Sequence, residues 1–159
     1  YRGIDNMDLA ARVAARMVEW EPDAVFIDSG AGEGVIDRLR QLGHDVVEVN
    51  FGGKAVTDAR FANRRAEMWM TLADQVRAGL AIPNDVGLKV ELATPTYSYD
   101  KQQRIIIESK DDIRKRLPGA GSPDIADALA LTFAYPVTAR KHGLLARAEA
   151  RGFDYDPYA

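Results

Sequence analysis

The chain contains no cysteine and only two histidines among its 159 residues. The lack of cysteine excludes disulfides, zinc ribbons and thiol nucleophiles. His44 and His142 are too few for a histidine-based metal site. No apolar run approaches the ~20 residues that a membrane span requires, and no secretory signal opens the chain. These absences predict a soluble, cytoplasmic protein with no membrane partner.

The composition, 47% hydrophobic and 28% charged, is that of one soluble globular domain. The net charge of −3 is unevenly distributed, because basic residues gather between positions 101 and 116. They are Lys101, Arg104, Lys110, Arg114, Lys115 and Arg116. A cluster of this kind indicates either a polyanionic partner or simply a solvated face.

Apolar spacing predicts an α/β domain over residues 1–138, followed by a tail over 139–159. The first half alternates helices (7–20 and 35–42) with short buried strands (24–28 and 46–49), which is typical of a parallel sheet. The second half is predicted to contain the following elements: a long helix over 57–79, an ambiguous segment at 85–92, a hairpin of 96–99 and 104–107, a short helix over 110–116, and a last helix from 122 to 134. Ser122 is the expected N-cap of that last helix, with Pro123 at its first position.

The run Asp28-Ser-Gly-Ala-Gly-Glu-Gly34 directly follows a predicted strand. Glycines at this position let a backbone approach a nucleotide, and Glu48 ends the next strand, where a ribose-binding carboxylate is found in dinucleotide-binding folds. By itself the run resembles the motif of S-adenosylmethionine-dependent methyltransferases. The alternative interpretation is purely structural: the glycines only permit a tight turn. A non-catalytic α/β interaction module is a further alternative.

Carboxylates at the ends of elements suggest a different site. Asp28 ends a buried strand, while Asp124 and Asp127 share one face of the last helix. Hard oxygen ligands of this kind suit Mg²⁺ or Mn²⁺, and two such ions can hold the attacking and leaving oxygens of a phosphodiester. The helix dipole alone also favours acidic residues in a first turn, so spacing by itself leaves both interpretations open.

Glu-Ser-Lys at 108–110 is followed by Ser-Pro-Asp-x-x-Asp-Ala-Leu at 122–129. This is the most specific of several motifs that resemble the C-terminal nuclease part of tailed-phage terminase large subunits. The strand and glycine turn at 25–34, and Asn-Arg-Arg-Ala-Glu-Met-Trp at 63–69, are similar as well. The resemblance covers about residues 1–135.

This resemblance implies a ribonuclease-H-like mixed sheet flanked by helices, and two divalent ions, Mg²⁺ or Mn²⁺. The implied activity is endonucleolytic cutting of concatemeric viral DNA during genome packaging, in the cytoplasm of a bacterial host that carries the phage or prophage. The implied partners are double-stranded DNA, an ATPase motor domain of the same polypeptide, the terminase small subunit and the portal. Asp28 matches the strand ligand and Asp124 the helix ligand, with Asp127 as the competing choice. The basic residues at 101–116 are then the expected DNA-binding set.

One feature of the family is missing. The family's first acidic ligand lies on an opening strand upstream of the helix at 7–20, and Asp5 and Asp8 do not replace it. We therefore expect an N-terminally truncated sheet in which the strand at 24–28 has an unpaired edge that favours self-association. We also expect the 159-residue chain alone to have weak or no nuclease activity.

Overall fold

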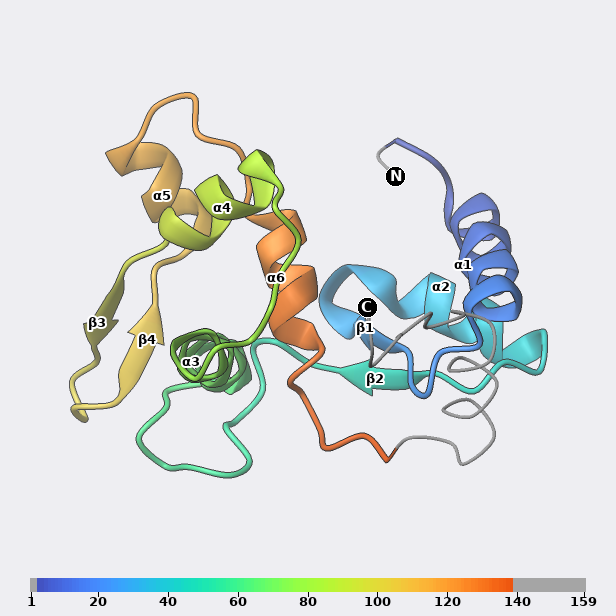
Figure 1. The fold of residues 1–159 in the computed structure, drawn as a ribbon, viewed down its shortest axis with the longest axis horizontal. Helices are drawn as coiled ribbons and strands as arrows, with labels where there is room; N and C mark the ends of the chain where they lie inside the picture. Colours follow the sequence, from blue (N-terminus) through green and yellow to red (C-terminus); the bar gives the residue numbers. More distant parts are fainter. Residues whose placement is uncertain (1–2, 139–159) are drawn as a thin grey trace, which may run out of the picture.

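The structure, a computed structural model, describes residues 3–138. Its first part pairs two helices, α1 (Asn6–Trp20) and α2 (Ser29–Gln41), beside two short parallel strands, β1 (Phe26–Asp28) and β2 (Val47–Val49) (Figure 1). The predicted α/β arrangement is thus confirmed here. Within the described part of the chain β1 pairs with β2 alone, so its other edge has no strand neighbour.

The second part surrounds a long helix and a short one that pack against each other, α3 and α6 (Figure 1). Its elements are α3 (Arg64–Arg77), α4 (Val86–Ala93), the antiparallel strands β3 (Tyr97–Tyr99) and β4 (Ile105–Ile107), α5 (Lys110–Arg116) and α6 (Asp124–Leu131). The hairpin and the short helix over 110–116 agree with their predictions, and the ambiguous segment at 85–92 is helical. None of the described helices is long and apolar enough to cross a membrane.

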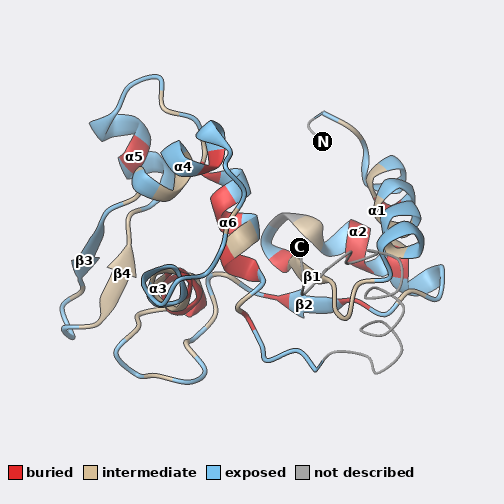
Figure 2. Ribbon diagram, in the orientation of Figure 1, coloured by how far each residue is buried: buried red, intermediate tan, exposed pale blue. Residues whose placement is uncertain are grey.

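The two faces of the β1–β2 pair bury two different cores. Ile27 packs toward α1 and α2, whereas Phe26 packs toward α3 and α6. Side chains alternate between the faces of a strand, so Asp28 shares the face of Phe26. Figure 2 shows the buried residues concentrated on α6 and on the inner side of α3. The strand therefore delivers its terminal carboxylate to the side on which α6 lies.

Several helix boundaries differ from the prediction, and the last helix, expected over 122–134, spans only Asp124–Leu131. The helix expected at 35–42 already begins at Ser29, and the helix expected at 57–79 begins only at Arg64. Asn63 fixes the latter start, because its side-chain oxygen accepts a hydrogen bond from the Ala66 amide at 2.9 Å. Apolar periodicity placed the helix start too early, because the residues just before Asn63 fit the apolar pattern of the helix but are not helical.

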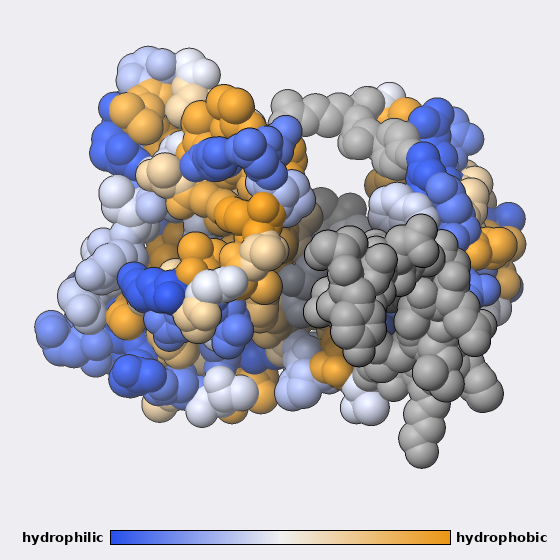
Figure 3. All heavy atoms as spheres, in the orientation of Figure 1, coloured by the Kyte–Doolittle hydropathy of each residue, from blue (hydrophilic) through white to orange (hydrophobic). Residues whose placement is uncertain are grey.

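Hydrophobic residues also gather on the surface over α4 (Figure 3), where Val86 and Val90 are exposed. The short helix buries only Leu88 in the core. The apolar residues of α4 therefore exceed what its packing requires.

A buried ion pair at the start of α3 organises the loop that follows β2. Arg64 and Glu67 are 4% and 3% exposed and bind each other. Glu67 also accepts hydrogen bonds from the backbone of Val56 at 3.0 Å and of Thr57 at 2.6 Å. Arg64 in turn donates to the carbonyl of Ala134, beyond α6. One pair thus ties the loop, α3 and the end of α6 together.

Burial alone would raise the pKa of Glu67, but hydrogen bonds from Thr57, Val56 and Arg64 outweigh it and lower the pKa to about 2. A depressed folded-state pKa contributes stability above the ordinary glutamate value of 4.5, and that stability is lost as the pH falls from there toward 2. We predict that Glu67→Gln destabilises the protein by about 3–5 kcal/mol at pH 7, because it leaves Arg64 buried without its carboxylate.

The measurement is urea unfolding of the wild type and of Glu67→Gln between pH 2 and pH 7, with Asp74→Asn at the exposed end of α3 as a control. The difference between wild type and Glu67→Gln shrinks below pH 4.5. An equal difference at all pH values would contradict the role of the ionised carboxylate.

Candidate active site

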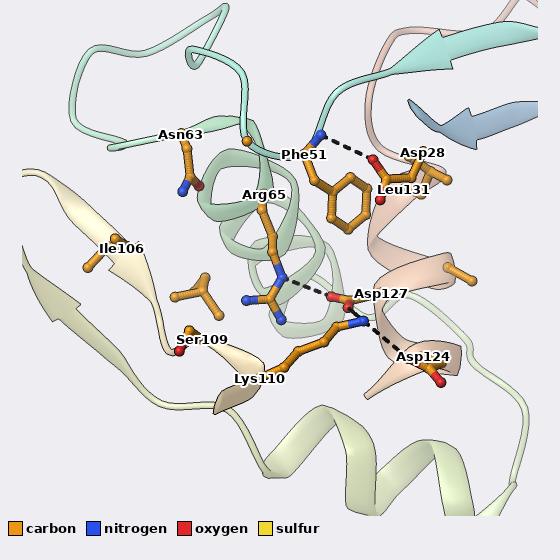
Figure 4. Close-up of a pocket in the computed structure, with 13 residues that line it drawn as sticks. Asp28, Phe51, Asn63, Arg65, Ile106, Ser109, Lys110, Asp124, Asp127 and Leu131 are labelled. Atoms are coloured by element: carbon orange, nitrogen blue, oxygen red, sulfur yellow. Dashed lines mark hydrogen bonds and ion pairs between the residues drawn. The ribbon is translucent and has the colours of Figure 1, made fainter. Parts of the chain in front are cut away.

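A pocket of about 550 Å³ opens beside the carboxyl end of β1, between α3, α5 and α6 (Figure 4). It brings together side chains that are distant in the sequence. They are Asp28, Phe51, Gly52, Asn63, Arg65, Ile106, Ile107, Ser109, Lys110, Asp124, Asp127, Ala128 and Leu131. All three carboxylates singled out from the sequence are among them.

Asp28 is both the last residue of β1 and the N-cap of α2. Its Oδ1 accepts hydrogen bonds from the Gly30 amide at 3.2 Å and from the Phe51 amide at 3.4 Å. The second bond joins the end of β1 to the loop after β2, and Figure 4 shows it across the top of the pocket. The carboxylate is thus oriented by backbone groups on two sides.

The glycines after Asp28 serve packing. They lie inside α2 and form no loop around a ligand. A Cβ on Gly32 would lie 2.7 Å from Ile27, and one on Gly34 would lie 2.5 Å from Asn6. Glycine therefore lets α2 approach β1 and α1 closely. The methyltransferase interpretation loses its glycine loop, and the tight turn of the alternative interpretation is replaced by close helix packing.

Asp127 is the most buried carboxylate of the pocket, at 7% exposure. Its Oδ1 accepts two hydrogen bonds, from the indole Nε1 of Trp69 at 2.8 Å and from Nε of Arg65 at 3.1 Å. Its Oδ2 is buried and accepts no hydrogen bond, while Nζ of Lys110 lies 3.3 Å away. The same ammonium lies 3.2 Å from Oδ1 of Asp124, whose side chain is about half exposed. Lys110 therefore occupies a cation position between two carboxylates.

The start of α6 differs from the prediction. Pro123 is its N-cap residue, and the hydroxyl of Ser122, the expected cap, is buried without a hydrogen bond. The orphan amides of Ile125 and Ala126 instead donate to Oε2 of Glu91 on α4, at 2.6 and 2.9 Å. No local pattern could have revealed Glu91, because it caps the helix across 34 positions of sequence.

The basic residues at 101–116 separate into two groups. Lys110 lines the pocket, whereas the other five lie outside its lining, on the hairpin or on α5, and four of them form ion pairs with neighbouring acidic residues. Lys101 lies in the turn of the hairpin. The ion pairs are Arg104 with Asp100, Arg114 with Asp111, Lys115 with Asp112, and Arg116 with Glu108.

Arg116 also has a structural task, because it donates to the carbonyl of Thr94 at 2.7 Å. Its hydrogen bonds to Glu108 lower the pKa of that carboxyl to about 2. Glu108 in turn binds the backbone and hydroxyl of Thr96. Arg116 therefore anchors α5 to the base of the hairpin.

No three acidic or histidine side chains converge into a ready-made metal centre among residues 3–138. The three carboxylates share one pocket, but Lys110 and Arg65 lie against Asp127 and leave no closed cage. A divalent ion bound here would need further oxygen ligands from water or from a substrate.

Comparison with known proteins assigns the fold. By sequence, the chain matches no protein-family model and no curated protein. By structure, it is similar to the nuclease domain of the large terminase subunit of bacterial virus Sf6, with a TM-score of 0.67 and 20% identity over 84% of this chain and 74% of that one. The chain has the terminase nuclease fold. Its ribonuclease-H-like class, expected from the resemblance, is thereby confirmed.

Two further structures support this assignment. A lysine-to-alanine variant of the Sf6 domain, solved with manganese, has a TM-score of 0.67 at 20% identity and is covered over 75% of its length. The large terminase nuclease from a thermophilic phage has a TM-score of 0.60 at 20% identity, with 84% of this chain and 64% of that one covered. Part of each of these chains therefore has no counterpart in this one.

We predict that Glu91→Ala destabilises the protein by about 1–2 kcal/mol, because α6 loses its only carboxylate cap among the described contacts. The measurement is thermal unfolding, with Lys89→Ala on the same helix as the matched control. An unchanged melting temperature for Glu91→Ala would show that water satisfies the α6 amides equally well.

Proposed function

We propose that this chain is a divalent-metal-dependent DNA endonuclease domain of a phage terminase large subunit, which cuts concatemeric viral DNA during genome packaging. The observation that carries the proposal is the pocket itself. It places carboxylates of β1 and α6 opposite cations of α3 and α5, within a fold shared with terminase nucleases.

The carboxylates fit Mg²⁺ or Mn²⁺. Asp28 and Asp124 supply hard oxygen ligands from two elements, and the buried Oδ2 of Asp127 accepts no hydrogen bond. The ammonium of Lys110 already lies between two of these carboxylates, which supports a cation at this position. Mg²⁺ sites that act on phosphates commonly combine one or two carboxylates with phosphate oxygens, so an open arrangement is appropriate. A bound ion would supply a water nucleophile and neutralise charge on the phosphate.

The chain's own residues have separate tasks in this arrangement. Asp28, held by the Gly30 and Phe51 amides, presents its second oxygen to the pocket. Lys110 neutralises Asp124 and Asp127 while no ion is bound, and it becomes available to a phosphate once an ion takes over those oxygens. The apolar residues Phe51, Ile107 and Leu131 line the remaining wall and limit access of water.

The proposal extends to the terminase context. The partners are double-stranded DNA, an ATPase motor domain in the same polypeptide, the small subunit and the portal, and the place of action is the host cytoplasm. The motifs at 108–110 and 122–129 support this extension. Self-association through the edge of β1 and weak activity of the 159-residue chain alone belong to the same proposal.

We predict that Mn²⁺ raises the melting temperature of the chain and that Asp28→Asn or Asp124→Asn removes this shift, because each change replaces a charged oxygen ligand by an amide. Asp74→Asn, a surface change on α3, should leave it intact. In the complete natural polypeptide, Asp28→Asn abolishes cutting of plasmid DNA in Mn²⁺.

S-adenosylmethionine serves as the contrasting ligand in the same assay. A shift with S-adenosylmethionine but not with Mn²⁺ would refute the metal site. Chelator-sensitive cutting that survives Asp28→Asn would refute its assignment to Asp28.

We predict a weaker and less salt-dependent interaction with duplex DNA when Arg114, Lys115 and Arg116 are replaced by Ala. Each lost phosphate contact lowers the slope of log K against log salt by roughly 0.9. Since Arg116 also anchors Glu108, the double change Arg114→Ala with Lys115→Ala is the cleaner variant. Arg77→Ala on α3 is the control, and an unchanged slope would assign the cluster to a solvated face.

A further inference from the structure

Arg65 has more hydrogen-bonding capacity than the protein uses. Its Nε donates to Oδ1 of Asp127 at 3.1 Å and its Nη1 to the carbonyl of Glu108 at 2.9 Å. The guanidinium also lies 5.7 Å from the centre of the Trp69 ring. Its Nη2 is buried and has no hydrogen-bond partner. A buried donor left unpaired costs roughly 1–3 kcal/mol, a cost that a ligand oxygen would remove.

The orientation of this guanidinium is fixed before any ligand arrives. Asp127 holds one edge, Glu108 a second, and Trp69 lies against it, while the side chain as a whole is only 13% exposed. Figure 4 shows Arg65 entering the pocket from α3, opposite the carboxylates of α6. A guanidinium so restrained loses little entropy when it binds an anion.

Lys110 completes this cationic wall. Arg65 and Lys110 bind opposite oxygens of the single carboxylate of Asp127. Lys110 also lies beside Asp124, so two cations face two carboxylates at this side of the pocket. Arg65 is held at three points, whereas Lys110 is 43% exposed.

We propose that Arg65 is a phosphate-binding residue, whose Nη2 donates to a non-bridging oxygen of the bound phosphodiester, and that Oδ1 of Asp127 is its positioning group. The inference rests on the proposed function, since the phosphodiester is that of the DNA substrate. The two oxygens of Asp127 thereby have different roles: Oδ1 orients Arg65, and Oδ2 faces the cation position that Lys110 occupies. Lys110 contributes the second positive charge to the same phosphate.

The test uses the two tryptophans as reporters, because the indole N–H of Trp69 donates to Asp127 whereas Trp20 lies exposed at the end of α1. A short DNA duplex is titrated into ¹⁵N-labelled wild-type chain in the presence of a chelator, so that no metal contributes. The Trp69 indole resonance is expected to shift in a saturable manner while that of Trp20 stays in place. A stationary Trp69 resonance during saturable binding of the duplex would overturn the proposal without any variant.

The variants then separate a bound phosphate from a structural role. Arg65→Lys keeps the charge beside Asp127 but removes the fork of donors, so duplex affinity falls by about tenfold with an unchanged salt slope. Arg65→Gln lowers the affinity further and reduces the slope by roughly 0.9. Arg77→Gln, near the other end of α3, changes neither. Arg65 variants that fold and bind the duplex as wild type does would overturn the proposal.

Failure of the proposed function is recognised separately, by Mn²⁺-dependent cutting of plasmid DNA by the complete wild-type polypeptide. If that cutting is present and the Arg65 variants behave as wild type in the titration, only the phosphate subsite is refuted. If cutting is absent and duplex binding still moves the Trp69 resonance, the nuclease assignment is refuted and the anion subsite stands.

Discussion

The carboxylate of Asp127 is the interaction on which the candidate site depends. It lies buried on α6 and receives Trp69 and Arg65 from α3 and Lys110 from α5. A buried charge is tolerated only when it is paired and hydrogen-bonded, so the burial of this carboxylate depends on the three elements staying together. The same packing places Asp124 one turn away, at the more exposed mouth of the pocket.

The second constraint is the balance of charge across the pocket. Asp28 and Asp124 with Asp127 face the cations of Arg65 and Lys110, so neither wall is left with a large uncompensated charge. A divalent ion would neutralise the acidic wall and release Lys110, while a phosphate would neutralise the basic wall.

One short run of sequence, 63–67, performs three different tasks. Asn63 caps α3, Arg65 enters the pocket, and Glu67 with Arg64 holds the loop after β2 and the end of α6. Because the helical repeat is 3.6 residues, neighbouring positions point in different directions and serve different surroundings. The loop fixed by this pair carries Phe51, whose amide orients Asp28. The first turn of α3 therefore stabilises the fold and also helps to shape the pocket.

The element pattern was largely readable from the sequence, because local signals determine it. The alternation at 24–28 and 46–49 predicts the parallel pair, and the apolar repeat at 7–20 predicts α1. At the starts of α2 and α3 the side chains of Asp28 and Asn63 cap the helices, a signal that apolar periodicity does not read. The glycines inside α2 show a further limit, since Gly34 permits close contact with Asn6 on α1, a residue distant in the sequence.

For the site, the sequence by itself determined the acidic residues, because Asp28 and Asp124 stand at recognisable ends of elements and within motifs that resemble terminase nucleases. Only the tertiary structure decided what surrounds them. The cap that Glu91 gives α6, the hold of Asp127 on Arg65 and the position of Lys110 between two carboxylates are contacts across 34, 62 and at most 17 positions. Such contacts depend on how helices pack, and the sequence pattern of a single helix carries no information about its neighbour's side chains.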